Sequence, residues 1–245
     1  MNDAVRGVLI VSPHLDDAAL SASHRLRAGG AVVVTVCAGL PSSDAPLGWW
    51  DRLSGASSAR GRQQERIAED VAAMRFARAT GVRLEHLDGQ HRNGAALDVD
   101  AVAADLHMLI SAASEVWLPA GIGHDDHQAT REAGMLAARR HRHTAAVLYA
   151  DVPHALTYGW PSSVTGERVE HLDVDAWLDH ELQQTGLDPA RLTAQVVHLD
   201  AAGREFKEKL LAHYATQLTV LRLDDRSLAR DPSLLAHELA GRWEL

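Results

Sequence analysis

The segment from Gly7 to Leu20, GVLIVSPHLDDAAL, constrains the fold more than any other part of the sequence. Val8 to Val11 form an apolar run without polar alternation, which is typical of a central strand buried on both faces of a parallel sheet. The run stops at a polar cluster that contains His14, Asp16 and Asp17. In an open α/β sheet, the loops at the carboxyl ends of the strands form the ligand-binding crevice. We therefore expect this cluster to line such a crevice.

A second segment repeats the pattern near the middle of the chain. The run from Glu115 to Ala120 is short and apolar, and it leads into GIGHDDH, which contains His124, Asp126 and His127. A helical pattern follows. If the two apolar runs form neighbouring strands, the two polar clusters converge at the same edge of the sheet.

Convergence would bring together the side chains of a metal site. His14, Asp17 and His127 would supply two imidazoles and a carboxylate, and three protein ligands plus water are typical of a catalytic zinc site. The other polar residues of the two clusters remain for the chemistry, and they are Asp16, His124 and Asp126.

The rest of the chain reads as alternating strands and helices. A β-branched run over 31–38 predicts a second strand, which completes a right-handed strand–helix–strand unit without the G-x-G-x-x-G of dinucleotide-binding proteins. A helix is predicted from Arg60 to Thr80, with Ile67, Val71 and Met74 on its buried side. The run from Val196 to Leu199 predicts a final strand, and Asp231-Pro232 predicts the start of a last helix.

Composition excludes several classes of protein. The 245 residues suit one α/β domain, and a net charge of -9 gives no basic surface for nucleic acid. The single Cys37 suits a reducing compartment. The start MNDAVRG does not resemble a signal peptide, and no apolar run approaches the roughly 18 residues of a membrane span. We expect a cytoplasmic protein without a membrane span.

The two motifs, PHLDD and HDDH, resemble those of the PIG-L (LmbE-like) family of zinc-dependent N-acetylglucosaminyl deacetylases. The resemblance implies a Rossmann-like α/β fold, a three-layer sandwich with a mostly parallel sheet. It implies one Zn²⁺ per chain and a hydrolase that removes an N-acyl group, most often acetyl, from a small molecule such as an amino sugar. It extends through YADVPH at 149–154 and YATQ at 214–217, and so covers most of the chain as a single domain, 1–245.

The resemblance also implies roles for individual residues. Zinc would be held by His14, Asp17 and His127. Asp16 would be the general base, and His124, oriented by Asp126, would act at the transition state. Leu15 and Ala18 differ from the commoner family motif, but neither position supplies a ligand or the base.

Arg66 and Asp88 match positions that can contact the substrate's hydroxyls in this family, and Trp50-Asp51 resembles a loop motif of some relatives. For Arg66 the alternative is a surface ion pair, and for Asp88 it is a turn carboxylate before Gly89. Trp50 belongs to a long connection over 40–58, where the indoles either pin the loop to the core or offer a platform to a sugar or an apolar aglycone. The segment 157–195 is predicted to be a flap or insertion over the site.

Two other functions fit part of the pattern. A metallophosphoesterase also uses Asp and His clusters, but it favours more carboxylates, a second metal and cationic phosphate clamps. A catalytically inactive sugar-binding relative would keep the fold and lose the base or a ligand, whereas every candidate residue is present here. The sequence therefore favours the zinc-dependent amidohydrolase.

Overall fold

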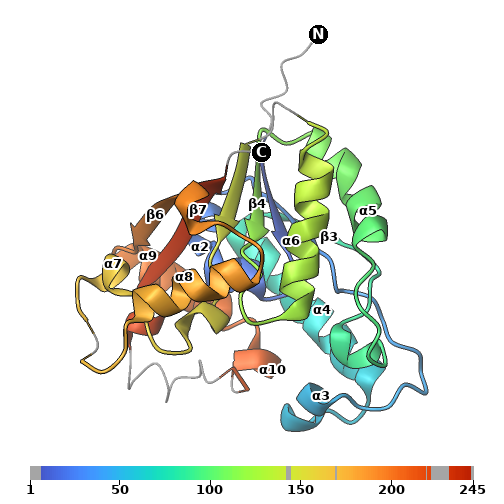
Figure 1. Ribbon diagram of the computed structural model, residues 1–245. Coiled ribbons are helices and arrows are strands. Elements are labelled where there is room, and N and C mark those ends of the chain that lie inside the picture. Colours follow the sequence, from blue (N-terminus) through green and yellow to red (C-terminus); the bar gives the residue numbers. More distant parts are fainter. Residues whose placement is uncertain (1–6, 142–144, 169, 219, 222–231, 244–245) are drawn as a thin grey trace.

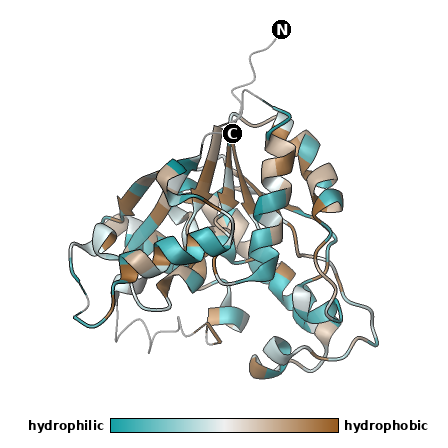
Figure 2. Ribbon diagram, in the orientation of Figure 1, coloured by the Kyte–Doolittle hydropathy of each residue, from teal (hydrophilic) through white to brown (hydrophobic). Residues whose placement is uncertain are grey.

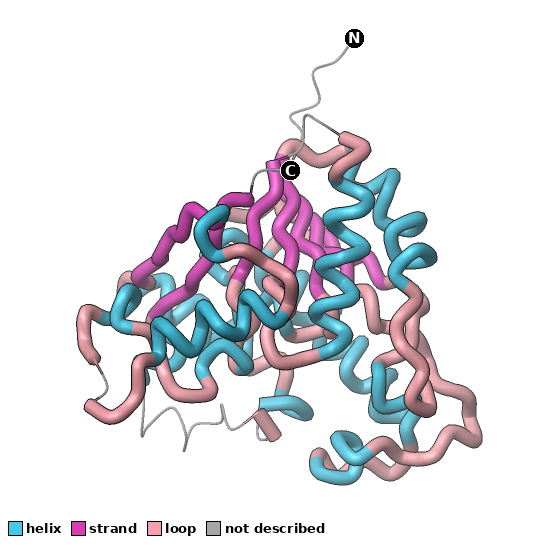
Figure 3. The backbone as a smooth tube through the Cα atoms, viewed as in Figure 1, coloured by secondary structure: helices cyan, strands magenta, loops and turns pink. Residues whose placement is uncertain are grey.

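The computed structural model describes residues 7–141, 145–168, 170–218, 220–221 and 232–243. These residues contain a seven-stranded sheet with helices on both faces (Figure 1, Figure 3), ordered β3-β2-β1-β4-β5-β7-β6. This mostly parallel α/β architecture confirms the predicted fold class. The strands are β1 (Val8–Ser12), β2 (Val32–Thr35), β3 (Thr80–Arg83), β4 (Glu115–Pro119), β5 (Ala145–Tyr149), β6 (Leu192–His198) and β7 (His237–Trp243).

Helices α5 and α6 cover one face of the sheet, and α1, α2, α4 and α9 contribute to the core on the other. The α-helices are α1 (Asp17–Ser21), α2 (Ser23–Arg27), α3 (Trp49–Leu53), α4 (Ala59–Ala77), α5 (Val99–Ser111), α6 (Asp125–Ala138), α7 (Ser162–Thr165), α8 (Val174–Gln184), α9 (Ala201–Leu211) and α10 (Ala215–Leu218). Short 3-10 helices are η1 (Gly89–His91), η2 (His154–Leu156), η3 (Pro189–Arg191) and η4 (Pro232–Leu235).

Strand β1 lies at the centre of the parallel part, hydrogen-bonded to β2 on one side and β4 on the other. Ile10 packs into the core on one face of the sheet, and Leu9 and Val11 pack into the core on the opposite face. Burial on both faces explains why this run has no polar alternation. Figure 2 shows the hydrophobic strands between helices whose outer surfaces are largely hydrophilic.

The pairing of β1 with β4 is the arrangement that the sequence required for the two polar clusters to converge. The strands are parallel, with Val8 beside Glu115 and Ile10 beside Trp117. The loops that follow them therefore leave the same edge of the sheet, and α1 and α6 begin there.

The last part of the sheet differs from the prediction. Strand β6 begins at Leu192, earlier than expected, and β7 inserts antiparallel between β5 and β6. Asp231 lies outside the described residues, and Pro232 begins the short η4, after which the chain becomes β7 instead of a helix. Strand β7 pairs only with distant strands, so local sequence gave little sign of it.

Helix α4 has the predicted location, with Met74 buried and Ile67 packed against the core as expected, whereas Val71 is exposed. The buried face also carries the polar side chains of Arg62, Arg66 and Asp70. The sequence of the helix alone could not predict these buried charged side chains, because their partners lie in other segments of the chain. Asp70, for example, accepts hydrogen bonds from Arg83 and Tyr214.

The segment 157–195 contains α7 and α8, and α8 packs beside the loops that follow β4 and β5. Leu178 lies in a small cluster with Ile122 and Ala155, and Arg131 donates a hydrogen bond to the carbonyl of Thr185. The predicted single domain stays a prediction. Among the described residues, every helix is too short or too polar to span a bilayer.

Candidate active site

A cavity of about 1060 Å³ lies at the carboxyl edge of the parallel strands. Its walls come from the loop after β1, from α3 and α4, from the loop after β3, from the start of α6, from the loop after β5 and from α10. All nine residues predicted for the site line this cavity, and they are His14, Asp16, Asp17, Trp50, Arg66, Asp88, His124, Asp126 and His127. None of the described residues of 157–195 lines it, so the predicted flap over the site finds no support there.

The three predicted metal ligands face one another in the cavity. His14 Nδ1 lies 3.4 Å from Asp17 Oδ2 and 3.3 Å from His127 Nε2, and His127 Nε2 lies 3.4 Å from Asp17 Oδ2. The three donor atoms thus form a nearly equilateral triangle. Zinc with bonds of about 2.0–2.1 Å in tetrahedral geometry needs donor atoms about 3.3–3.4 Å apart. The residues present therefore fit a zinc ion.

The tight turn after β1 fixes the first two ligands. Ser12 Oγ donates to the carbonyl of His14 and accepts from the backbone N–H of Ala18, so that one hydroxyl closes the turn. Asp17 is the first residue of α1, and its Oδ2 accepts from the backbone N–H of His14. The motif thus places both donors by local hydrogen bonds.

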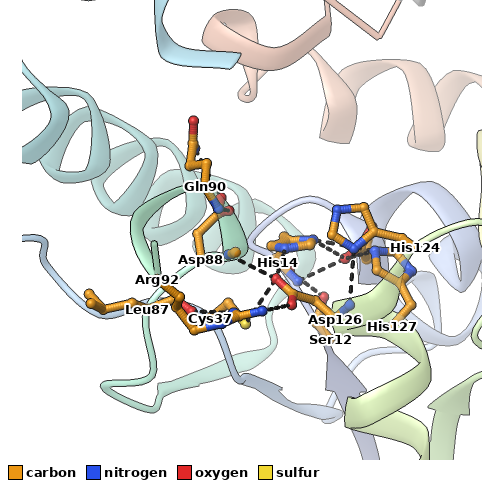
Figure 4. Close-up of polar contacts among 12 residues, drawn as sticks. Ser12, His14, Cys37, Leu87, Asp88, Gln90, Arg92, His124, Asp126 and His127 are labelled. Carbon is orange, nitrogen blue, oxygen red and sulfur yellow. Dashed lines mark hydrogen bonds and ion pairs between the residues drawn. The ribbon is translucent and has the colours of Figure 1, made fainter. Parts of the chain in front are cut away.

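The second nitrogen of His14 lies against Asp126. His14 Nε2 is 3.2 Å from Asp126 Oδ2, which also accepts from the backbone N–H of Gly89 at 3.0 Å, while Arg92 pairs with Oδ1 (Figure 4). Burial alone would raise the pKa of Asp126, but these hydrogen bonds from His14 and Arg92 lower it well below the usual range. The carboxylate is therefore ionised, and it favours the tautomer of His14 in which Nε2 carries the proton and Nδ1 is free for a metal.

The second nitrogen of His127 is held in the same way by Asp151. His127 Nδ1 is 2.8 Å from Asp151 Oδ1, and Asp151 Oδ2 accepts from the backbone N–H of Ile122. Asp151 is buried and comes from the loop after β5. Its position in YADVPH is the signal in the sequence that could have indicated this role. Both candidate histidine ligands thus have a carboxylate on the nitrogen that faces away from the metal, a common support for zinc ligands.

His124 is held by the backbone of Asp126 and not by its carboxylate. His124 is the N-cap of α6, and the backbone N–H of Asp126 donates to His124 Nδ1 at 3.1 Å. Asp126 thus contacts His124, as expected, but through its backbone, and its orienting role stays a prediction. Burial lowers the pKa of His124 to about 4, with help from the neighbouring His14 and His127. The ring is neutral near pH 7, and its proton sits on Nε2.

Asp16 lies beside the ligand Asp17 but faces a different environment. It is buried, and its side chain makes no hydrogen bond that caps α1. Burial raises the pKa of Asp16 to about 7, and the adjacent Asp17 raises it further in the same direction. For Asp17, burial would also raise the pKa, but the nearby His127 and His14 lower it well below the usual range. The two neighbouring carboxyl groups therefore have different proton affinities, as expected of a base beside a ligand.

A second group of possible metal donors shares the same surroundings. His14, Cys37 and Asp126 offer atoms close to one another, with Cys37 Sγ 3.8 Å from Asp126 Oδ2. Burial raises the pKa of the Cys37 thiol to about 12, so the thiol keeps its proton near pH 7. The negative charge of the Asp126 carboxylate is already balanced by its ion pair with Arg92. The donor chemistry therefore suits a cation less well here than at His14, Asp17 and His127.

Two of the three candidate substrate-binding residues are tied into the scaffold. Arg66 is buried, and its Nη1 lies 3.1 Å from Asp51 Oδ1, so its interpretation as a surface ion pair is wrong. Two other nitrogens of Arg66, Nε and Nη2, are buried without a hydrogen-bond partner. Asp88 accepts from the backbone N–H and the side chain of Gln90, as a turn carboxylate does, while lining the cavity.

Several residues that line or support the site were not found from the sequence. Asp51, Arg92 and Asp151 act through contacts with partners 15 or more positions away, which a local pattern does not show. His154 is a further imidazole in the cavity wall, with its ring centroid 5.6 Å from that of His124 and 5.2 Å from that of His127.

The sequence matches no protein-family model and no curated protein. Solved structures do match. A deacetylase of the teicoplanin biosynthesis pathway is 25% identical over 96% of both chains, with a TM-score of 0.71. The deacetylase of the A40926 pseudoaglycone is 27% identical over 98% of this chain and 97% of the other, with a TM-score of 0.65.

Two more matches, at lower identity, share the fold. One is a zinc-inhibited form of the teicoplanin deacetylase, 24% identical over 96% and 97% of the two chains with a TM-score of 0.69. The other is the N,N'-diacetylchitobiose deacetylase of Pyrococcus horikoshii, 13% identical over 94% of this chain and 75% of the other with a TM-score of 0.51. These four structural neighbours are deacetylases of the LmbE/PIG-L type, which confirms the resemblance indicated by the two motifs.

Proposed function

We propose that this chain is a zinc-dependent N-deacetylase that hydrolyses an N-acyl group, most often acetyl, on an amino sugar or on a small molecule that carries one. The observation that carries the proposal is the triangle of donor atoms from His14, Asp17 and His127, at 3.3–3.4 Å, with the buried carboxyl of Asp16 beside it in the cavity wall. The deacetylase activity of the structural neighbours supports the same reaction.

His14, Asp17 and His127 would hold one zinc ion. Zinc supplies Lewis acidity, which polarises an amide carbonyl and makes water acidic enough to attack near pH 7. Asp126 and Asp151 keep the two imidazoles in the required tautomers.

Asp16 is proposed as the general base. Its backbone neighbour Asp17 turns towards the two histidines, whereas the Asp16 carboxyl lines the cavity with no hydrogen-bond partner that caps α1. A base must take a proton from the attacking water and later deliver one to the departing amine. The Asp16 side chain is the carboxyl group best placed for both transfers, because Asp126 and Asp151 are engaged by the histidines.

His124 is proposed to stabilise the oxyanion. Since the backbone N–H of Asp126 occupies Nδ1, the ring presents Nε2–H as a hydrogen-bond donor. A donor held in advance towards the position where negative charge develops lowers the barrier without any reorganisation. Arg92 forms an ion pair with the Asp126 carboxylate and so supports the turn that carries His124. Asp126 thus supports His14 through its side chain and His124 through its backbone.

Asp88, Arg66 and Trp50 are proposed to bind the substrate. Asp88 offers carboxylate oxygens to sugar hydroxyls, and burial, which alone would raise its pKa, is outweighed by the charge of His14 and the hydrogen bond from Gln90. The net effect lowers the pKa of Asp88, so it accepts hydrogen bonds as an ionised group. Arg66 carries spare N–H groups beside the cavity. An indole such as Trp50 suits the apolar face of a sugar ring.

The proposed reaction is tested with zinc-loaded protein and a panel of N-acetylated amino sugars. The panel contains N-acetylglucosamine, N-acetylgalactosamine, N,N'-diacetylchitobiose and their methyl glycosides, and both released acetate and free amine are measured. Equal amounts of both products, absent in the Asp17→Ala variant, are expected. Release of phosphate from aryl phosphates without any amide hydrolysis would instead favour a metallophosphoesterase, and zinc binding without turnover would favour an inactive sugar-binding protein.

A further inference from the structure

The loop between β4 and α6 is pressed against the helix that carries His127. Gly121 and Gly123 in this loop both have a positive φ, at 87° and 70°, a conformation that favours glycine. A Cβ on Gly121 would lie 2.9 Å from the Cα of Gln128 and 3.0 Å from Nη1 of Arg131, and both of these residues belong to α6. The loop therefore takes a path that leaves no room between it and the helix.

This loop supplies the backbone donor that fixes Asp151. The N–H of Ile122 donates to Asp151 Oδ2 at 2.8 Å, and the other oxygen of that carboxylate lies 2.8 Å from His127 Nδ1. Asp151 and His127 are each only 1% exposed, so solvent water does not compete for either contact. The direction of the His127 ring thus depends on where the loop holds the N–H of Ile122.

Arg131 holds the loop from the side of α6, one turn after His127. The Arg131 side chain is buried, and its Nη1 donates to the carbonyl of Ala120 at 2.7 Å. Its Nη2 donates to the carbonyl of Thr185, the C-cap of α8, at 2.6 Å. Because the N–H groups of a buried guanidinium need hydrogen-bond partners, both carbonyls are kept close to it. One side chain therefore joins α6, the loop after β4 and the end of α8.

Helix α8 covers the loop with apolar side chains. It lies beside α6 (Figure 1), and its Leu178 packs in one cluster with the loop residues Ala120 and Ile122. The same cluster contains Ala150, which directly precedes Asp151 in the chain. The apolar contacts of α8 thus support both segments that meet in the hydrogen bond between Ile122 and Asp151.

We propose that Arg131 and α8 form a clamp on the loop after β4, and that this clamp positions the metal ligand His127 through Ile122 and Asp151. The inference rests on the proposed function and deepens it by naming a positioning residue and a role for the segment that contains α8. Arg131 does not line the cavity, so it acts on the site only through the loop. Loss of the outer partners of a metal ligand costs roughly 10- to 100-fold in metal affinity.

The test compares Arg131→Met with Arg62→Met. Arg62 is the matched control, because it is also buried and also donates to a backbone carbonyl, that of Ser54, but belongs to α4 and does not line the cavity. Zinc affinity is measured by competition with a chelator. The visible absorption of Co²⁺-loaded protein reports the coordination geometry, and urea unfolding of metal-free protein reports the stability of each variant.

A second pair of variants tests the apolar side of the clamp with less risk to folding. Leu178→Ala removes the contact of α8 with the loop. Val174→Ala is its control, because Val174 is a buried residue of the same helix outside the cluster that contains Ile122. Both pairs are measured in the same way.

We expect Arg131→Met to bind zinc at least about 10-fold more weakly than the parent and to shift the Co²⁺ absorption bands. Arg62→Met should lose stability but keep the zinc affinity and the Co²⁺ spectrum of the parent. Arg131→Lys, which keeps the charge but can reach only one of the two carbonyls, should fall between the parent and Arg131→Met. Leu178→Ala should weaken zinc binding more than Val174→Ala does.

Two results would overturn the clamp and leave the proposed deacetylase standing. One is a zinc affinity of Arg131→Met that is lowered no more than that of Arg62→Met. The other, which decides the matter if Arg131→Met does not fold, is an unchanged zinc affinity in both Arg131→Lys and Leu178→Ala. Parent protein that binds neither zinc nor Co²⁺ would overturn the proposed function and the clamp with it.

Discussion

The carboxylate of Asp126 lies 3.2 Å from Nε2 of His14 and supports this ring, not the ring of His124. Through its backbone N–H the same residue fixes the tautomer of His124. One residue at the start of α6 thus connects the candidate metal ligand on the β1 loop with the candidate oxyanion donor. The arrangement separates two effects that a substitution at Asp126 can have, one on metal affinity and one on turnover.

Replacement of Asp126 by Asn should weaken zinc binding. The amide keeps the shape but loses the charge that favours the Nε2–H tautomer of His14 and pairs with Arg92, and loss of such a supporting carboxylate costs roughly 10- to 100-fold in metal affinity. Zinc affinity is measured by competition with a chelator, with Asp125→Asn as the control because that carboxylate is exposed on the same turn. Unchanged affinity with lower kcat would show that Asp126 serves His124 after all.

Removal of the proposed base should separate chemistry from metal binding. Asp16→Ala is expected to keep its zinc and to lose roughly 10²-fold or more in kcat, because the nearby carboxylates of Asp126 and Asp151 are engaged by the histidines. Zinc content is measured by plasma mass spectrometry on the same sample that is assayed. Loss of zinc along with activity would make Asp16 a ligand or a structural residue instead of the base.

His124→Phe should lower kcat with little change in KM. The phenyl ring fills the space but cannot donate a hydrogen bond to the oxyanion, and loss of one such donor costs roughly 10²- to 10³-fold in kcat. His171→Phe is the control, because its side chain is highly exposed on another part of the chain. A higher KM at unchanged kcat would assign His124 to substrate binding.

Glu238, which does not line the cavity, should make the stability of the fold depend on pH. It is buried and accepts from Ser23, His24 and Lys207. Burial would raise its pKa, but Lys207 and His24 lower it to about 2, from an ordinary value of 4.5. Because the folded pKa is depressed, this stabilisation is present above pH 4.5 and is lost as the pH falls towards 2.

The corresponding variant is Glu238→Gln. At pH 7 its free energy of unfolding should be lower by about 3–5 kcal/mol, because Lys207 is left buried without a charged partner. The difference from the parent should shrink as the pH falls from 5 to 2. Urea unfolding at several pH values measures this difference in the free energy of unfolding and its change with pH. Glu205→Gln is the control, because it breaks an exposed ion pair with Lys209 and should change the free energy of unfolding by less than about 1 kcal/mol. An equally large effect of both substitutions would contradict the role of Glu238.

Much of the site could be predicted because its key residues follow apolar strands directly. The run from Val8 to Val11 gave the position of β1, and the similar run before His124 gave β4, so the meeting of His14 and His127 followed from a rule of sheet topology. Those inferences used only local pattern and one general property of α/β folds.

The remaining parts depend on contacts between distant segments. Arg66 is buried because Asp51 lies beside it, and no pattern within α4 reveals this partner. Asp151 reaches His127 only after β5 has paired with β4. Strand β7 pairs only with β5 and β6, so its seven residues carry no local sign of a place inside the sheet. Ion pairs and strand pairs between distant segments, and not weak local propensities, therefore limited what could be predicted from the sequence.

The most direct measurement is a zinc titration of metal-free protein, with bound zinc and acetate release followed together in the parent, His14→Ala and His127→Ala. In the parent, activity towards an N-acetylated amino sugar should rise in step with bound zinc and reach its maximum at one zinc per chain. Both variants should bind little zinc and release little acetate. Full activity in metal-free parent protein, or one tightly bound zinc in both variants, would contradict a catalytic zinc at His14, Asp17 and His127.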